Sequence, residues 1–160
     1  MCIRDSYYVM TGQTATYYST DAYTWTAATH PFTGIGYAVI WDGNNSRWML
    51  GGNGTGTTIA TSTLSPPSSW TAVASASVMG AVRGLGWNGS YYVAVGNGTN
   101  NIAWSQNSTS WNGLSTTYLS TSGYAVYWYN NAWIAVGSGT YNVAWSTNTV
   151  NWFNPIFQTS

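Results

Sequence analysis

Three residues at one position of a repeated pattern have side chains suited to binding a polar ligand. Tyr37, Arg83 and Tyr124 each stand four residues before a tryptophan that recurs along the chain. A tyrosine ring stacks on apolar ligand surfaces, and its hydroxyl and a guanidinium hydrogen-bond to polar groups. If their strands converge, the three residues would bind a sugar or a similar polar ligand. The alternative is that the tyrosines pack between repeats and Arg83 is a solvated surface charge.

Side chains for acid–base or metal chemistry are scarce. The chain has 3 acidic residues and contains no glutamate or lysine. Catalysis by paired carboxylates would have to use Asp21 and Asp42, which fall in different repeats. A single His30 and a single Cys2 make neither a metal site nor a Cys–His pair. We therefore predict no catalytic residue, no metal and no cofactor.

The composition argues against two classes of partner. The net charge is zero and only 4% of the residues are charged, so there is no basic patch for nucleic acid. No apolar run approaches the ~20 residues of a membrane-spanning helix. Aromatic residues make up 17% of the chain, including 11 tryptophans, which suits packing of large flat side chains between layers of strands.

Anchor residues recur in register and define a repeat. One tryptophan ends a polar turn in each copy, and by subtraction its copies lie 45, 41 and 41 residues apart. Repeats of roughly 40–50 residues with four strand-like segments each are typical of β-propeller blades. No segment shows the long 3.6-residue apolar period that helical repeats require. The anchors are the turn tryptophans Trp25, Trp70, Trp111 and Trp152, the turn serines Ser19, Ser62, Ser105 and Ser146, and the strand-ending Trp41, Trp87 and Trp128.

The repeat predicts an all-β fold, a β-propeller fragment of about four consecutive, four-stranded antiparallel blades. The blades span about residues 7–32, 33–78, 79–120 and 121–160. In the second blade we expect strands near 36–42, 47–52, 57–62 and 69–74. Segments such as 91–95 lack polar alternation, so each sheet should be covered on both faces by its neighbours. The exposed end blades should then associate with the remaining blades of a larger protein or with other copies.

Residues 1–6, MCIRDS, fit no position of the repeat. They resemble translated sequencing adapter, and they contain no apolar core of a signal peptide. We therefore treat them as a non-native prefix and expect them to be unpaired, which would leave the first blade without its inner strand.

The polar turn resembles the Asp-box, or bacterial neuraminidase repeat, whose pattern is Ser-x-Asp-x-Gly-x-Thr-Trp. The copy from Ser19 to Trp25 keeps the aspartate as Asp21, but it is one residue shorter than the family pattern and lacks the glycine. In the family this turn is structural and lies away from the active site. The resemblance thus implies structural roles for Ser19, Asp21, Trp25, Ser62, Trp70, Ser105, Asn107, Trp111, Ser146, Asn148 and Trp152.

Sialidases of that family use an arginine cluster, a tyrosine nucleophile with a glutamate partner, and an acid/base aspartate. This chain has no glutamate, and its arginines are Arg4, Arg47 and Arg83. The Gly-x-Gly-Thr loops at 52–55, 96–99 and 137–140 superficially resemble phosphate-binding loops. Each is followed by a strand pattern rather than a helix, so we interpret them as turns that use glycine for positive φ.

We expect a non-catalytic binding or adhesion module for a glycan or another polar surface ligand, within a larger secreted or virion-surface protein such as a phage tail protein. Two alternatives remain open. One is a fragment of a sialidase-like glycoside hydrolase whose catalytic residues lie in other blades, and the other is a purely structural spacer.

Overall fold

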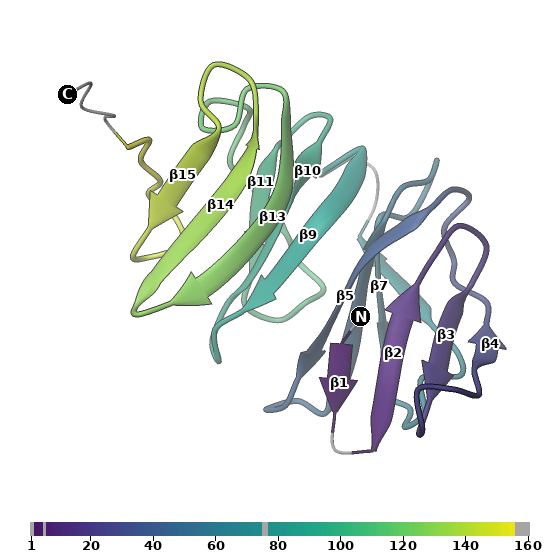
Figure 1. Ribbon diagram of the computed structural model, residues 1–160. Helices are drawn as coiled ribbons and strands as arrows, with labels where there is room; N and C mark the ends of the chain where they lie inside the picture. The colour runs from purple at the N-terminus through teal and green to yellow at the C-terminus, as the bar shows by residue number, and fades with distance from the viewer. Residues whose placement is uncertain (1, 5, 75–76, 156–160) are drawn as a thin grey trace.

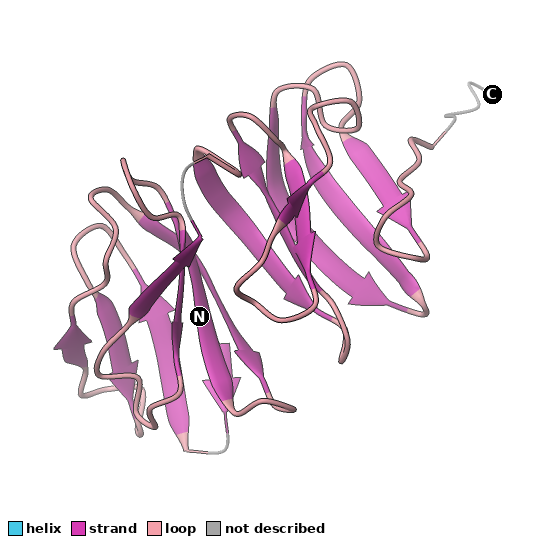
Figure 2. Ribbon diagram, turned by 180° about the vertical axis from the view of Figure 1, so that it is seen from behind, coloured by secondary structure: helices cyan, strands magenta, loops and turns pink. Residues whose placement is uncertain are grey.

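The computed structural model describes residues 2–4, 6–74 and 77–155. These residues form fifteen strands in four sheets and contain no helix (Figures 1 and 2). They accordingly include no helical segment that could span a membrane. The all-β prediction is confirmed.

Each sheet is an antiparallel meander in which every strand pairs with the next one along the chain. The bounds predicted for the first two strands of the second sheet are those observed, and the other two strands begin two residues later than predicted. The first sheet contains β1 (Cys2–Arg4), β2 (Tyr7–Thr11), β3 (Thr16–Ser19) and β4 (Thr26–Ala28), and the second contains β5 (Gly36–Asp42), β6 (Arg47–Gly52), β7 (Ile59–Ser62) and β8 (Thr71–Ala74). The third sheet contains β9 (Ala81–Trp87), β10 (Tyr92–Asn97), β11 (Ile102–Ser105) and β12 (Asn112–Gly113), and the fourth contains β13 (Ser122–Tyr129), β14 (Ala132–Ser138) and β15 (Val143–Ser146).

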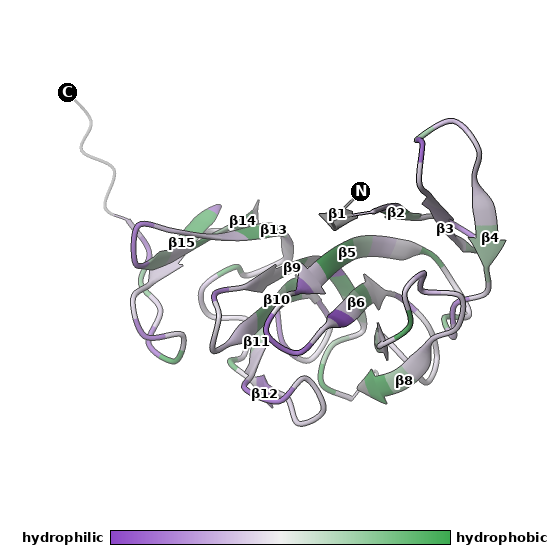
Figure 3. Ribbon diagram, turned by 90° about the horizontal axis from the view of Figure 1, so that it is seen from below, coloured by the Kyte–Doolittle hydropathy of each residue, from purple (hydrophilic) through white to green (hydrophobic). Residues whose placement is uncertain are grey.

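The sheets fan out from a common centre when the molecule is viewed end-on (Figure 3). Their first strands β1, β5, β9 and β13 lie nearest the centre, and β4, β8, β12 and β15 lie at the periphery. Strand β9 contacts both β5 and β13. The first strand of each sheet is therefore innermost.

Aromatic cross-strand pairs join the first two strands of the last three sheets. The second ring of each pair is fully buried, so each pair anchors its hairpin in the core. The pairs, with their ring-centroid distances, are Trp41–Trp48 at 5.0 Å, Trp87–Tyr92 at 4.0 Å and Trp128–Trp133 at 5.1 Å. Asparagine and glycine residues at positive φ, which tight hairpin turns require, connect the strands beside two of these pairs: Gly89, and Asn130 with Asn131.

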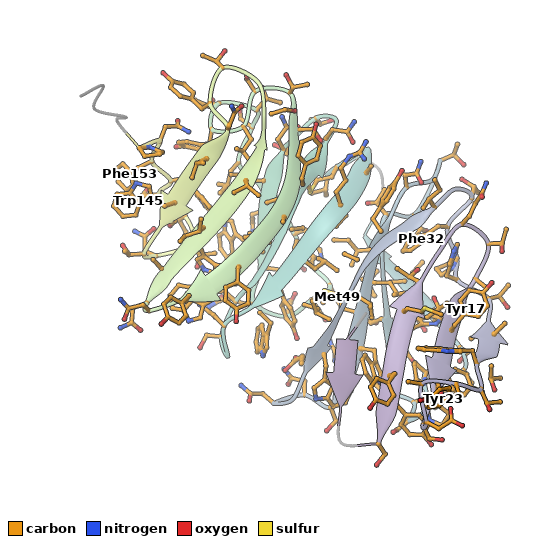
Figure 4. The ribbon with its side chains drawn as sticks, viewed as in Figure 1. Tyr17, Tyr23, Phe32, Met49, Trp145 and Phe153 are labelled. Carbon is orange, nitrogen blue, oxygen red and sulfur yellow. The ribbon has the colours of Figure 1, made fainter. Side chains whose placement is uncertain are left out.

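Hydrophobic clusters fill the spaces between successive sheets. In β10, Tyr92 and Ala94 belong to the cluster shared with the second sheet. Val93 and Val95 belong to the cluster shared with the fourth. All four side chains are completely buried. The predicted stacking, in which a central sheet is covered on both faces, is confirmed, and Figure 4 shows the Met49 side chain directed between two sheets.

The two end sheets differ from the predictions. Strand β1 pairs with β2, with Ile3 opposite Tyr8, so the first sheet has an inner strand and the expected lack of pairing is wrong for residues 2–4. The free N–H and C=O groups at the edge of β2 can pair with any short extended segment, whatever its origin. Met1 and Asp5 lie outside the described residues. In the fourth sheet the described residues supply three strands, and an isolated bridge between Trp145 and Phe153 stands where a fourth was expected.

Deletion of residues 1–6 should lower the free energy of unfolding by about 1–3 kcal/mol, because it removes the ladder hydrogen bonds of β1 and exposes the edge of β2. Chemical denaturation of the full and shortened chains measures the difference. Identical unfolding curves would show that β1 contributes nothing to the fold.

Candidate ligand-binding site

The three predicted ligand-binding residues occupy equivalent irregularities of the inner strands. On β5, Gly36 pairs with Gly52 and Ala38 pairs with Gly51, so Tyr37 has no residue opposite it. The same one-residue shift leaves Arg83 without an opposing residue on β9, and Tyr124 without one on β13. Each of the three is thus the extra residue of a β-bulge. Bulges redirect a side chain out of the regular alternation and are enriched beside functional sites.

The bulges matter because the side chains of regular inner-strand residues pack against the neighbouring sheets. On β9, Leu85 belongs to the cluster shared with the second sheet. The next residue, Gly86, lies against the fourth sheet, since a Cβ there would be 2.7 Å from the Trp133 ring. The side chain of a bulge residue lies outside the regular alternation between these two faces, so it is the one available for a ligand.

Two of the three side chains are in direct contact. The guanidinium carbon of Arg83 lies 5.1 Å from the centroid of the Tyr37 ring, which is cation–π geometry. Among the described residues, the buried Nε of Arg83 has no hydrogen-bond partner. Tyr124 is 51% exposed, and its hydroxyl lies 3.0 Å from Oγ of Ser138. The Tyr124 backbone lies close to the residue after Arg83, because a Cβ added to Gly84 would be 3.1 Å from the carbonyl oxygen of Tyr124.

An aromatic cavity of about 240 Å³ lies further along the same three strands and was missed by the sequence analysis. At ~3.3 Å per residue, the tryptophans that line it are ~13 Å along the strand from the bulges. The recurrence of tryptophan at the end of each inner strand is the signal in the sequence that marks this cavity. The lining residues are Ile40, Trp41, Leu85, Gly86, Trp87, Val126, Tyr127 and Trp128.

Comparisons with known proteins establish the fold. No protein-family model matches the sequence, and no curated protein matches it significantly. The solved structures that match 93% of this chain include a chain in the crystal structure of the nidogen/laminin complex, with a TM-score of 0.67 and 13% identity, and the GH74 enzyme of Niastella koreensis, with a TM-score of 0.61 and 19% identity. Both contain β-propellers. This chain is an array of β-propeller blades. It spans 59% of the first matched chain and 22% of the second, and at these identities the likeness concerns the fold alone.

The two described aspartates are engaged in structural hydrogen bonds away from the bulges. Asp42 is completely buried and accepts hydrogen bonds from the Tyr92 hydroxyl, from the backbone N–H groups of Asn44 and Asn45, and from the Asn45 side chain. The Tyr92 contact joins the second blade to the third. Burial, together with the Asp42 carboxylate, raises the pKa of Tyr92. Arg47 makes a second link between these blades, donating to the carbonyl of Asn107 and to Ser108.

Three of the four polar turns share one hydrogen-bonding pattern. In the first, an Asp21 carboxylate oxygen accepts the N–H groups of Tyr23 and Thr24 at 2.8 Å each, and the Trp25 indole donates to the carbonyl of Ala22 at 3.1 Å. Asn107 with Trp111, and Asn148 with Trp152, repeat these contacts. The turn serines Ser19, Ser62, Ser105 and Ser146 are all buried.

The second blade departs from this turn. Ser62 Oγ accepts the N–H of Leu64, and the buried indole nitrogen of Trp70 has no hydrogen-bond partner among the described residues. This turn is longer than the others, since Trp70 follows Ser62 by 8 residues where the other turn tryptophans follow their serines by 6, and it contains a cis Ser65–Pro66 bond. Pro66 also lines a second cavity of about 290 Å³ together with Tyr7 and Tyr18 of the first blade. Of the turn tryptophans Trp152 is buried, whereas Trp25, Trp70 and Trp111 are partly buried.

The Gly-x-Gly-Thr loops lead into strands, so none forms a phosphate-binding loop before a helix. Gly98 and Gly139 have φ of 117° and 123°, as expected for glycine turns. Gly54 has no such φ, and a Cβ there would lie 3.0 Å from atoms of Thr33. Close packing, rather than positive φ, therefore favours glycine at this position. Within the described ranges no three His, Cys, Asp or Glu side chains form a group that could hold a metal ion.

The turn hydrogen bonds should keep the Asp21 carboxyl group ionised down to a pH of about 2. Backbone N–H groups of Thr24 and Tyr23, and then the Ser19 hydroxyl, lower the pKa of Asp21 from 3.8 to about 2. The stabilisation is therefore complete above pH 3.8 and is lost as the pH falls towards 2. An NMR titration of the Asp21 carboxyl group should give a midpoint near 2, and Ser19→Ala should raise it. A midpoint at the unperturbed value in the folded chain would contradict the turn geometry.

Proposed function

We propose that this chain is a non-catalytic carbohydrate-binding module, and that its ligand binds along the inner strands β5, β9 and β13. The observation that carries the proposal is the recurrence of a bulge at one position in three successive blades, with tyrosine, arginine and tyrosine as the extra residues. Aromatic rings and a guanidinium outside the β-ladder provide both stacking surfaces and hydrogen-bond donors.

The charge of Arg83 supports a ligand at this position. Asp21 and Asp42 are both held by turn or hairpin hydrogen bonds, so neither described aspartate neutralises the guanidinium. Its contact with the Tyr37 ring holds the side chain in place while leaving N–H groups that can bind hydroxyl or carboxylate oxygens.

The aromatic cavity extends this surface along the same strands. Indole rings pack against the apolar faces of sugar rings, and the cavity is lined by Trp41, Trp87 and Trp128 at the ends of the three inner strands. A carbohydrate chain, which offers hydroxyl groups and apolar faces alternately, suits both parts of the surface. We also propose a location on a secreted or virion-surface protein, which rests on the resemblance of the turn sequence to the Asp-box.

The proposal is tested by screening the chain on a glycan array and titrating the best-bound glycan by calorimetry. Arg83→Ala and Tyr124→Ala should each weaken binding roughly tenfold or more, since a lost stack or charged hydrogen bond costs about 1–3 kcal/mol. Tyr23→Ala is the matched control, because Tyr23 is 91% exposed on a peripheral turn. Binding of a neutral glycan should depend weakly on salt, and binding of an acidic one strongly.

Two results would contradict the proposal. One is an array on which no glycan is bound. The other is equal affinity for the parent, the Arg83 variant and the Tyr124 variant, which would remove the bulges from the site.

A further inference from the structure

The outward face of the fourth blade is a continuous apolar surface. Strand pairing places Ile134 opposite Tyr127 on one side and opposite Trp145 on the other, and Trp145 opposite Phe153. Figure 4 shows Trp145 and Phe153 together at the outer edge of the molecule, and their ring centroids are 5.1 Å apart. Six of the twelve large exposed hydrophobic side chains found among the described residues lie here: Tyr127, Tyr129, Ile134, Val136, Trp145 and Phe153.

The equivalent positions of the inner blades are buried by the next blade. In each of the last three blades the turn serine pairs with the equivalent residue of the second strand: Trp48, Tyr92 and Trp133. The residues that follow these three are therefore also equivalent, and they are Met49, Val93 and Ile134. Val93 and Met49 are completely buried, whereas Ile134 is 46% exposed. The outward face of the fourth blade is thus the same surface that the second and third blades use to bind the blade after them.

The first blade carries the complementary half of this interface. Tyr8 aligns with Trp48, Tyr92 and Trp133, the residues through which each later blade contacts the blade before it. Those three are completely buried, and Tyr8 is partly exposed. Met10 and Tyr17, which pair across the same sheet, are also partly exposed, and Tyr17 lies on the outer side in Figure 4.

We infer that the outward face of the fourth blade binds the outward face of the first blade of a second copy of this chain. The two faces are the halves of an interface that the chain already forms three times between its own blades. No charged side chain is among the exposed residues of the fourth-blade face, so a like apolar sheet suits it.

The association closes into a ring of two copies. A head-to-tail contact generates a ring when its rotation closes, and two four-sheet chains would give eight blades, within the usual range of 4–8. Such a ring contains two identical seams and covers both end faces of each copy. It goes beyond the proposed carbohydrate binding, which needs only β5, β9 and β13.

Sedimentation equilibrium of the full chain measures the association. At ~100 μM, above the μM limit of standard interfaces, the parent should have twice the 17.3 kDa mass of one chain. Ile134→Asp and Tyr17→Asp should each be monomeric, because every seam then contains one altered face. Leu64→Asp is the matched control, since Leu64 is 45% exposed on a loop of the second blade, and it should remain a dimer.

An equimolar mixture of the two variants provides the sharper test. One seam of the mixed pair joins two unaltered faces, so the mixture should regain dimers that neither variant forms alone. Ile134→Ser and Tyr17→Ser repeat the comparison if circular dichroism shows that an aspartate variant is unfolded. A monomeric parent, a ladder of larger masses, a mixture that stays monomeric, or a Tyr17 variant that dimerises like the parent would each overturn the ring. The last result would instead indicate that two fourth blades bind each other.

Discussion

The sheets of this chain are apolar on both faces, so each of them needs a neighbour on each side. The contrast between β10 and β14 makes the constraint visible. Tyr92 to Val95 are all completely buried, because the third blade lies between two others. In β14 the equivalent residues alternate, with Trp133 and Ala135 buried and Ile134 and Val136 exposed. Burial of a large apolar side chain contributes roughly 1.5–3 kcal/mol, so the number of stacked blades dominates stability.

This packing also determines where a ligand can bind. The side chains of regular inner-strand residues pack against the neighbouring sheets on both sides. Charged groups such as Asp42 form hydrogen bonds between blades, as in its buried contact with the Tyr92 hydroxyl. Only residues outside the ladder, such as Arg83, or at strand ends, such as Trp87, remain available near the common centre. These bulges and aromatic strand ends are the residues through which we propose that the ligand binds.

Much of this architecture could be predicted from the sequence, because the anchors recur with local physical signals. The Asn88-Gly89 hairpin, the second-blade strands and the turns around Asp21 and Asn107 all follow from residue type and spacing. The bulges could not be predicted, since a one-residue shift depends on pairing partners that no local pattern reveals. Strand β1 was missed because its residues carry no anchor. Trp152 and Trp111 share a motif but differ in burial, because neighbouring structure sets their exposure.

We propose that the inner strands bind the ligand through their bulges and their aromatic ends. Two-dimensional NMR spectra of the chain with and without the glycan selected on the array test it most directly. We expect shifts in the backbone amides of Tyr37, Arg83 and Tyr124 and in the indole N–H groups of Trp41, Trp87 and Trp128, with the turn indoles of Trp25 and Trp111 unchanged. Shifts confined to the peripheral turns, with the inner strands unchanged, would contradict it.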